Sequence, residues 1–144
     1  IYSLKIKMRN LEEIKKENIQ KEVISEIRKA KNEILATMNI TEEQLSPLPV
    51  KYFSLLNRKN KQGVKIKRIV FGSVKQYKYF LKGVKEKKLF FSGKHTKSKN
   101  YKRMIIIDGN KLFFKKKIKD KSKFYFTTNN KYLKEYKTYF NKFN

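Results

Sequence analysis

The stretch YKRMIIIDGNKLFF, at residues 101–114, decides the fold that we expect for this chain of 144 residues. Its apolar run MIII has the length of a buried strand. Asp108 closes the run and is followed by Gly109 and Asn110, which favour a turn because Asp and Asn tolerate left-handed conformations and Gly adopts them freely. The stretch therefore predicts a strand at 103–107 that leads into a hairpin, with Asp108 at a sheet edge.

Helix and strand patterns alternate on both sides of this stretch. Asn10 and Glu13 have the spacing of a capping box, which predicts a helix that starts at Leu11 and continues through an apolar stripe to Ala30. The other expected elements are, in chain order, a buried strand at 34–38, a helix from Val50 that ends at Gly63, a strand at 64–71, a helix after Ser73, a strand at 89–91, a mobile loop at 92–102, strands at 111–118 and 123–128, and a closing aromatic helix.

The order of these elements predicts an α/β fold. A helix followed by Gly63 and the strand pattern Val-Lys-Ile-Lys is typical of a crossover into a parallel sheet. The hairpin-rich segment that follows favours antiparallel pairing. We therefore expect one domain over residues 1–144, with a mixed parallel and antiparallel sheet flanked by helices.

The net charge of +26 lies almost entirely in residues 44–144, which hold 29 basic and 4 acidic side chains, against 9 and 8 in residues 1–43. The positive electrostatic field of such a segment attracts polyanions and phosphorylated ligands. Of the 38 basic side chains 33 are Lys, which suits bidentate recognition of phosphates or bases less than Arg does. We therefore expect anionic partners, while the Lys richness also fits a bias of AT-rich coding sequence. No particular nucleic-acid-binding residues are assigned.

Several classes of function are disfavoured by the composition. The absence of Cys excludes disulfides, thiolate nucleophiles and zinc-thiolate sites, and it fits a reducing compartment such as the cytoplasm. The sequence contains no run of 18 apolar residues, so we expect no membrane span. We expect no cofactor and no metal ion. Because the chain begins at Ile1, it is expected to be a fragment of a longer protein.

Residues 101–109 resemble a motif of the phospholipase D superfamily, His-x-Lys-x4-Asp followed by Gly. Here the frame reads Tyr101-x-Arg103-x4-Asp108-Gly109, so the spacing and the apolar filler match while Tyr and Arg replace His and Lys. Residues 55–67 also resemble that superfamily's helix and its Gly-Val-Lys strand. The resemblance implies a phospholipase D-like half-domain.

In active members of the superfamily, the motif His attacks phosphorus and the Lys neutralises the phosphate. By position, Tyr101 replaces the nucleophile, and a phenol with an ordinary pKa of about 10 is a poor substitute at neutral pH unless a base activates it. Arg103 keeps the positive charge and can grip two phosphate oxygens. Asp108 is chiefly structural support in the family. The resemblance thus implies a degenerate motif that has lost catalysis and kept its anion-binding geometry.

The chain is most similar to the effector domain of archaeal TrmB-type transcription regulators. Glu33-Ile34-Leu35, and Thr128-Asn129-Asn130 with the aromatic helix after it, stand where that domain has comparable segments, so the similarity covers residues 11–143. It implies a non-catalytic, ligand-sensing and dimerising domain of a transcription regulator, with a DNA-binding winged helix preceding Ile1. An effector, which could be anionic, would bind near Tyr101, Arg103, Asp108 and the loop residues His95 and Lys97.

Two alternative functions remain open from the sequence. His95-Thr96-Lys97 is a true His-x-Lys and holds the chain's only His, so a metal-independent phosphodiesterase or nuclease completed by dimerisation is conceivable. However, the position that needs Asp is Lys102, and polar residues replace the apolar filler, which favours a solvated surface His. The Lys-and-aromatic segment 111–126 suits a general nucleic-acid-binding module, although a strand pair with solvent-facing Lys explains it better.

Two further patterns have simpler structural explanations. Glu42-Glu43 could form a paired carboxylate site, but next to Thr41 they more often mark the first turn of a helix. The Tyr and Phe stripe of the closing helix favours core packing over a ligand cage.

Overall fold

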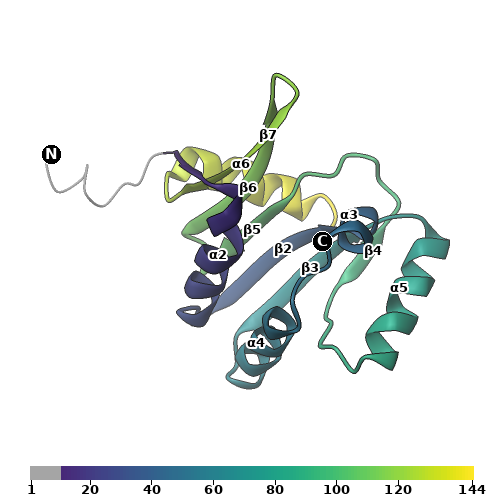
Figure 1. Ribbon diagram of the computed structural model, residues 1–144. Coiled ribbons are helices and arrows are strands. Elements are labelled where there is room, and N and C mark those ends of the chain that lie inside the picture. Colours follow the sequence, from purple (N-terminus) through teal and green to yellow (C-terminus); the bar gives the residue numbers. More distant parts are fainter. Residues whose placement is uncertain (1–10) are drawn as a thin grey trace, which may run out of the picture.

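A seven-stranded mixed sheet with helices on both faces forms the centre of the molecule (Figure 1). The structure is a computed structural model and describes residues 11–144. Its elements are β1 (Glu12–Ile14), a 3-10 turn η1 (Lys16–Asn18), α2 (Ile19–Arg28), β2 (Glu33–Asn39), α3 (Ile40–Leu45), α4 (Val50–Lys61), β3 (Lys65–Phe71), α5 (Val74–Glu86), β4 (Lys94–Thr96), β5 (Met104–Ile107), β6 (Lys111–Ile118), β7 (Lys121–Thr127) and α6 (Asn130–Asn141).

The strands lie in the order β1-β7-β6-β5-β2-β3-β4. The pairs β2–β3 and β3–β4 are parallel, and the other four pairs are antiparallel. The α/β class with a mixed sheet is confirmed. Gly63, with a φ of +95°, follows α4 as expected, and the chain then enters β3 beside β2.

Alternate residues of the central strands enter two different apolar layers, because successive side chains of a strand point to opposite faces. Ile34 and Ala36 of β2 pack with buried residues of α2 and α4. Leu35, between them, packs with Leu133, Tyr136, Tyr139 and Phe140 of α6. The aromatic stripe of the closing helix is therefore core, as predicted. In Figure 1, α2 and α4 lie in front of the sheet and α6 lies behind it.

The predicted helix start at Leu11 is wrong, and Asn10 lies outside the described residues. Residues 12–14 form β1, which pairs antiparallel with β7, and α2 begins only at Ile19. The open edge of β7 satisfies the backbone groups of β1, and Ile14, only 6% exposed, joins the core. Tertiary pairing outweighs the local capping signal here.

Two expectations near the second sheet edge are also corrected. Residues 89–91 form no strand; Leu89 and Phe90 pack against the core cluster, and Phe91 makes an edge contact with Phe80. The short strand β4 lies instead within the predicted loop at 92–102, and it pairs with β3. Asp108 does precede a hairpin, but β5 is an internal strand, so it closes a central strand rather than an edge one.

Candidate ligand-binding site

The segment that leads into β5 is held by two hydroxyl groups. Tyr139 donates to the Asn100 carbonyl at 2.6 Å and accepts from the Lys102 N–H at 2.7 Å. Thr37 donates to the Lys102 carbonyl at 2.6 Å and accepts from the Met104 N–H at 3.0 Å. The backbone on both sides of residues 101 and 103 is therefore fixed by α6 and β2.

Tyr101 is held between an aromatic surface and a carboxylate. Its ring packs on Phe71 with centroids 5.2 Å apart, and its hydroxyl donates to Glu42 Oε1 at 3.0 Å. Burial, together with the charge and hydrogen bond of Glu42, raises the pKa of Tyr101 well above its ordinary value, although Arg103 opposes this. The phenol therefore stays protonated at neutral pH, with its hydroxyl proton directed at Glu42.

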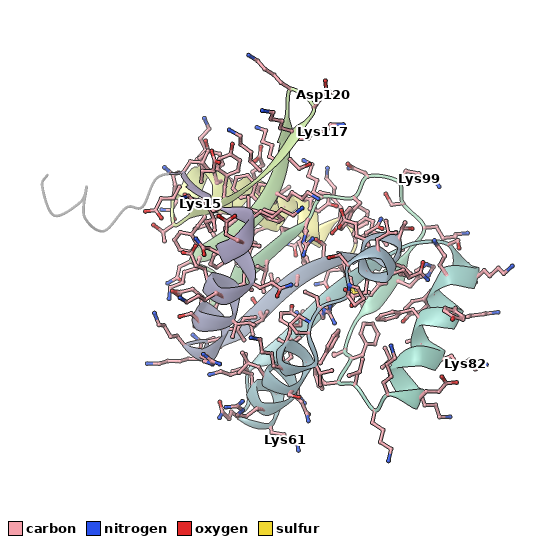
Figure 2. All side chains as sticks on the ribbon, in the orientation of Figure 1. Lys15, Lys61, Lys82, Lys99, Lys117 and Asp120 are labelled. Atoms are coloured by element: carbon pink, nitrogen blue, oxygen red, sulfur yellow. The ribbon has the colours of Figure 1, made fainter. Side chains whose placement is uncertain are left out.

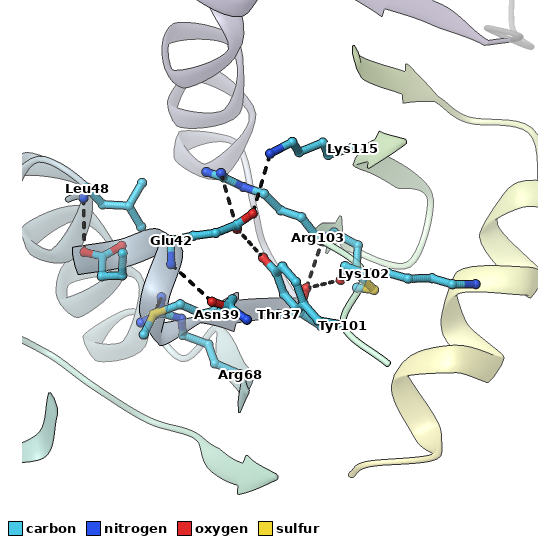
Figure 3. A network of polar contacts seen from close by, with 12 residues as sticks. Thr37, Asn39, Glu42, Leu48, Arg68, Tyr101, Lys102, Arg103 and Lys115 are labelled. Atoms are coloured by element: carbon cyan, nitrogen blue, oxygen red, sulfur yellow. Dashed lines mark hydrogen bonds and ion pairs between the residues drawn. The ribbon is translucent and has the colours of Figure 1, made fainter. Parts of the chain in front are cut away.

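Glu42 forms ion pairs with two cations of the site, as Figure 3 shows. Arg103 Nη1 lies 3.9 Å from Glu42 Oε1, and Lys115 Nζ lies 3.5 Å from Glu42 Oε2. The three side chains are 28–40% exposed, so each ion pair contributes at most about 1 kcal/mol. The carboxylate of Glu42 therefore pairs with Arg103 in the place where the resemblance puts a phosphate.

The first turn of α3 positions Glu42. The Asn39 side chain accepts from the Glu42 N–H at 3.1 Å and caps the helix, which starts where β2 ends. The expectation that Glu42-Glu43 mark a first turn is confirmed. Sequence reasoning nevertheless missed that Glu42 meets Tyr101; the signal was its place directly after a buried parallel strand, where sites commonly form.

Asp108 lies at the opposite end of β5 from Tyr101 and Arg103. Its carboxylate accepts from the backbone N–H groups of Lys31, Asn32 and Glu33 at 2.7–3.2 Å. Burial alone would raise the pKa of Asp108, but these hydrogen bonds lower it below its ordinary value. Asp108 therefore ties the α2–β2 connection to the β5–β6 turn and has a structural role.

The other two predicted site residues, His95 and Lys97, lie in different surroundings. His95 Nε2 lies 2.7 Å from the Gly72 carbonyl, and its ring stacks on Tyr77 with centroids 4.5 Å apart. Because a carbonyl only accepts, Nε2 must carry the proton. Lys97 lies in a surface pocket that Tyr101 also lines, and His95 does not. Tyr101 thus lines one pocket with Lys97 and other pockets with Arg103, and His95 lines none of them.

A cavity of about 100 Å³ adjoins Tyr101 and Arg103, between α2, α3, α4 and the sheet. Its wall includes one residue that the sequence did not single out, Arg68 of β3. Within residues 11–144, no group of three acidic or His side chains could hold a metal ion. Within the same range, no helix has the length and hydropathy to cross a bilayer.

Solved structures share this α/β fold with its mixed sheet. TrmBL2, an archaeal chromatin protein whose structure shows a novel mode of DNA binding, shares it with a TM-score of 0.64 and 17% identity, over 93% of this chain and 51% of that one. NucT from Helicobacter pylori shares it with a TM-score of 0.60 and 15% identity, over 93% of both chains. The chain spans about half the length of TrmBL2. No family model and no curated protein matches the sequence.

Proposed function

We propose that the chain is a non-catalytic phospholipase D-like domain that senses a ligand and dimerises within a cytoplasmic transcription regulator. DNA would be bound through a domain that precedes Ile1. The observation that carries the proposal is the contact between the Tyr101 hydroxyl and Glu42. A protonated phenol stands where the resemblance puts the nucleophile, and the carboxylate beside it would repel the phosphate that a nuclease must bind. The likeness to TrmBL2 supports the association with DNA.

Sensing requires that a ligand bind two arrangements of the protein with different affinity, because equal affinity shifts no equilibrium. Glu42 offers such a difference. A ligand that competes for Arg103 or Lys115 would release the carboxylate, and α3, which carries it, packs against α5. A change at the site would therefore reach the outer helix layer.

Phosphodiesterase activity is expected to be absent. Wild type, His95→Ala and Tyr101→His should each hydrolyse bis(4-nitrophenyl) phosphate in chelator no faster than buffer. In wild type the phenol is inert, and in Tyr101→His the ring would still face Glu42. Release of 4-nitrophenolate measures this. Turnover by wild type that disappears in His95→Ala would establish the nuclease alternative instead.

Direct nucleic-acid binding is a second candidate function, favoured by the β6–β7 hairpin. The hairpin projects from the sheet, and Figures 1 and 2 show its tip, with Lys117 and Asp120, extending away from the helices. Asp120 is the single acidic residue in the segment KKKIKDKSK at 115–123, which holds six Lys. This concentration of charge on a projecting ribbon suits contact with a phosphate backbone.

If the hairpin binds DNA, affinity for a mixed-sequence duplex should fall steeply with salt. Replacing Lys117, Lys119 and Lys121 by Gln should lower the slope of log K against log salt by about 0.9 for each phosphate that is no longer neutralised. Fluorescence anisotropy between about 50 and 200 mM salt measures the slope. The matched control replaces Lys75, Lys78 and Lys82, exposed residues of α5. If both triple variants lowered the slope equally, the hairpin would not be a specific contact with DNA.

A further inference from the structure

Arg68 is a buried cation with unused hydrogen-bonding capacity. The residue is only 2% exposed, on the face of β3 that α4 covers. Its Nη2 lies 3.2 Å from Met38 Sδ, a weak acceptor, while Nε and Nη1 have no hydrogen-bond partner among the described residues. The rings of Tyr52, Phe53 and Phe91 lie 5.8–6.0 Å from Cζ.

The surroundings offset only part of the cost of this burial. A guanidinium cannot lose its proton inside a protein, and each buried donor without a partner destabilises the folded state. Aromatic faces attract the cation but satisfy no N–H group. Burial raises the pKa of the neighbouring Glu43 more than the positive charge of Arg68 lowers it. Glu43 Oε1 also accepts a hydrogen bond from the Leu48 N–H. No ion pair links Arg68 to a carboxylate within the described part of the chain.

The cavity beside Arg68 is mainly apolar and small. Ile24, Ala36, Leu48 and Tyr52 contribute apolar wall, and the volume is about 100 Å³. A buried apolar cavity of about 150 Å³ accommodates benzene, which has six non-hydrogen atoms, so this smaller and partly open space suits roughly four within its walls. Arg68 extends from β3 toward α3, as Figure 3 shows, and it forms part of the cavity wall.

The charges around the cavity select among anions. Arg103 and Lys115 are already paired with Glu42, which leaves Arg68 as the cation without a carboxylate partner in the lining. Glu42 and Glu43 also line the cavity and would repel a second negative charge. The lining thus holds three cations and two carboxyl groups, a surplus of one positive charge, which matches a single negative charge on a compact apolar body.

We propose that this cavity binds a small monocarboxylate with a short branched or cyclic apolar body, whose carboxylate accepts hydrogen bonds from Arg68. The inference rests on the proposed function in that it names the class of ligand to be sensed. It differs from the sequence-based expectation, because the anchoring cation is Arg68 of β3 and not Arg103, so sensing would not require that Glu42 be released from Arg103 or Lys115. Filling the cavity would also brace Glu43 and the loop from α3 to α4.

The direct test is an NMR titration of the Arg Nε–H signals of the ¹⁵N-labelled chain. Isobutyrate, with six non-hydrogen atoms, is the probe, and isobutyramide is the uncharged isostere. We expect isobutyrate to shift the Arg68 signal saturably, with a Kd of about 10 mM or tighter, which is well within the affinity that six atoms can provide. Isobutyramide should bind at least about tenfold more weakly, because it brings no charge to Arg68.

Arg68→Met tests the anchor, with Arg58→Met as the matched control, because Arg58 is exposed on α4. Thermal unfolding with and without isobutyrate should show a ligand-induced rise in Tm for wild type and Arg58→Met, and none for Arg68→Met. Without ligand, Arg68→Met should be as stable as wild type or more stable, because an unpaired buried charge is removed.

Three outcomes would overturn the inference: no saturable shift up to about 50 mM, equal affinity for acid and amide, or tighter binding of inorganic phosphate than of isobutyrate. If Arg68→Met fails to fold, the comparison of acid and amide in wild type still decides. The phosphodiesterase assay does not depend on any of these results. Failure of the carboxylate site is thus distinguishable from failure of the non-catalytic assignment.

Discussion

Replacing Phe71 with alanine should destabilise the protein by about 3–5 kcal/mol, the largest loss that we expect from a single side chain. Phe71 ends β3 and is 1% exposed. Its ring contacts Tyr101 at 5.2 Å, Phe143 at 5.0 Å and Tyr139 at 6.5 Å between centroids. Truncation would leave a cavity between the sheet and α6 that these rigid rings cannot fill without moving.

The same substitution should disturb the site, because Phe71 supports the ring of Tyr101 and Tyr139 anchors the backbone around it. Urea unfolding followed by circular dichroism gives the free energy. Tyr79→Ala is the matched control, since Tyr79 is 70% exposed on α5, and it should cost less than about 0.5 kcal/mol. Similar losses in the two variants would show that the aromatic cluster does not support the fold.

The fold was largely predictable because its strongest signals are local. A short apolar run closed by Asp108 and Gly109, and a helix ended by Gly63, each indicate an element without reference to the rest of the chain. The structure confirms the strands and hairpin on either side of this turn. The elements at the two sheet edges were missed, because β1 and β4 have only three residues each. Such short strands form because they pair with neighbouring strands, and no local sequence pattern indicates that pairing.

The site was predicted only in part, for a comparable reason. Position in the motif placed Tyr101 beside Arg103, and the structure adds that both meet Glu42, 59 residues away from Tyr101 in sequence. Nothing near Glu42 signals this contact except its place after a buried strand. Arg68 was missed because Arg is seldom buried, although in the alternation of β3 it shares the face of Ile66 and not that of the neighbouring Lys67. Its burial depends on the rings of α4, which only the tertiary structure supplies.

Asp108→Asn should cost about 2–3 kcal/mol, since an amide oxygen is a weaker acceptor than a carboxylate for three backbone N–H groups. The φ of Asp108 is +53°, which Asn tolerates, so backbone strain does not contribute. Asp120→Asn is the matched control because Asp120 also has a positive φ, of 62°, in an exposed hairpin turn. It should change stability by less than about 0.5 kcal/mol.

The pH dependence of this difference identifies its cause. Because the folded pKa of Asp108 is lowered, the unfolded chain binds the proton more readily, and stability rises with pH between the folded pKa and the unfolded value of about 3.9. The contribution is complete above the unfolded value and is lost as pH falls through the folded one. Denaturant unfolding should therefore show a constant gap between wild type and Asp108→Asn from about pH 7 to 5, and a shrinking gap below about pH 4. A gap that stays constant into strong acid would mean that lost packing, and not the charged hydrogen bonds to the α2–β2 connection, makes this residue necessary.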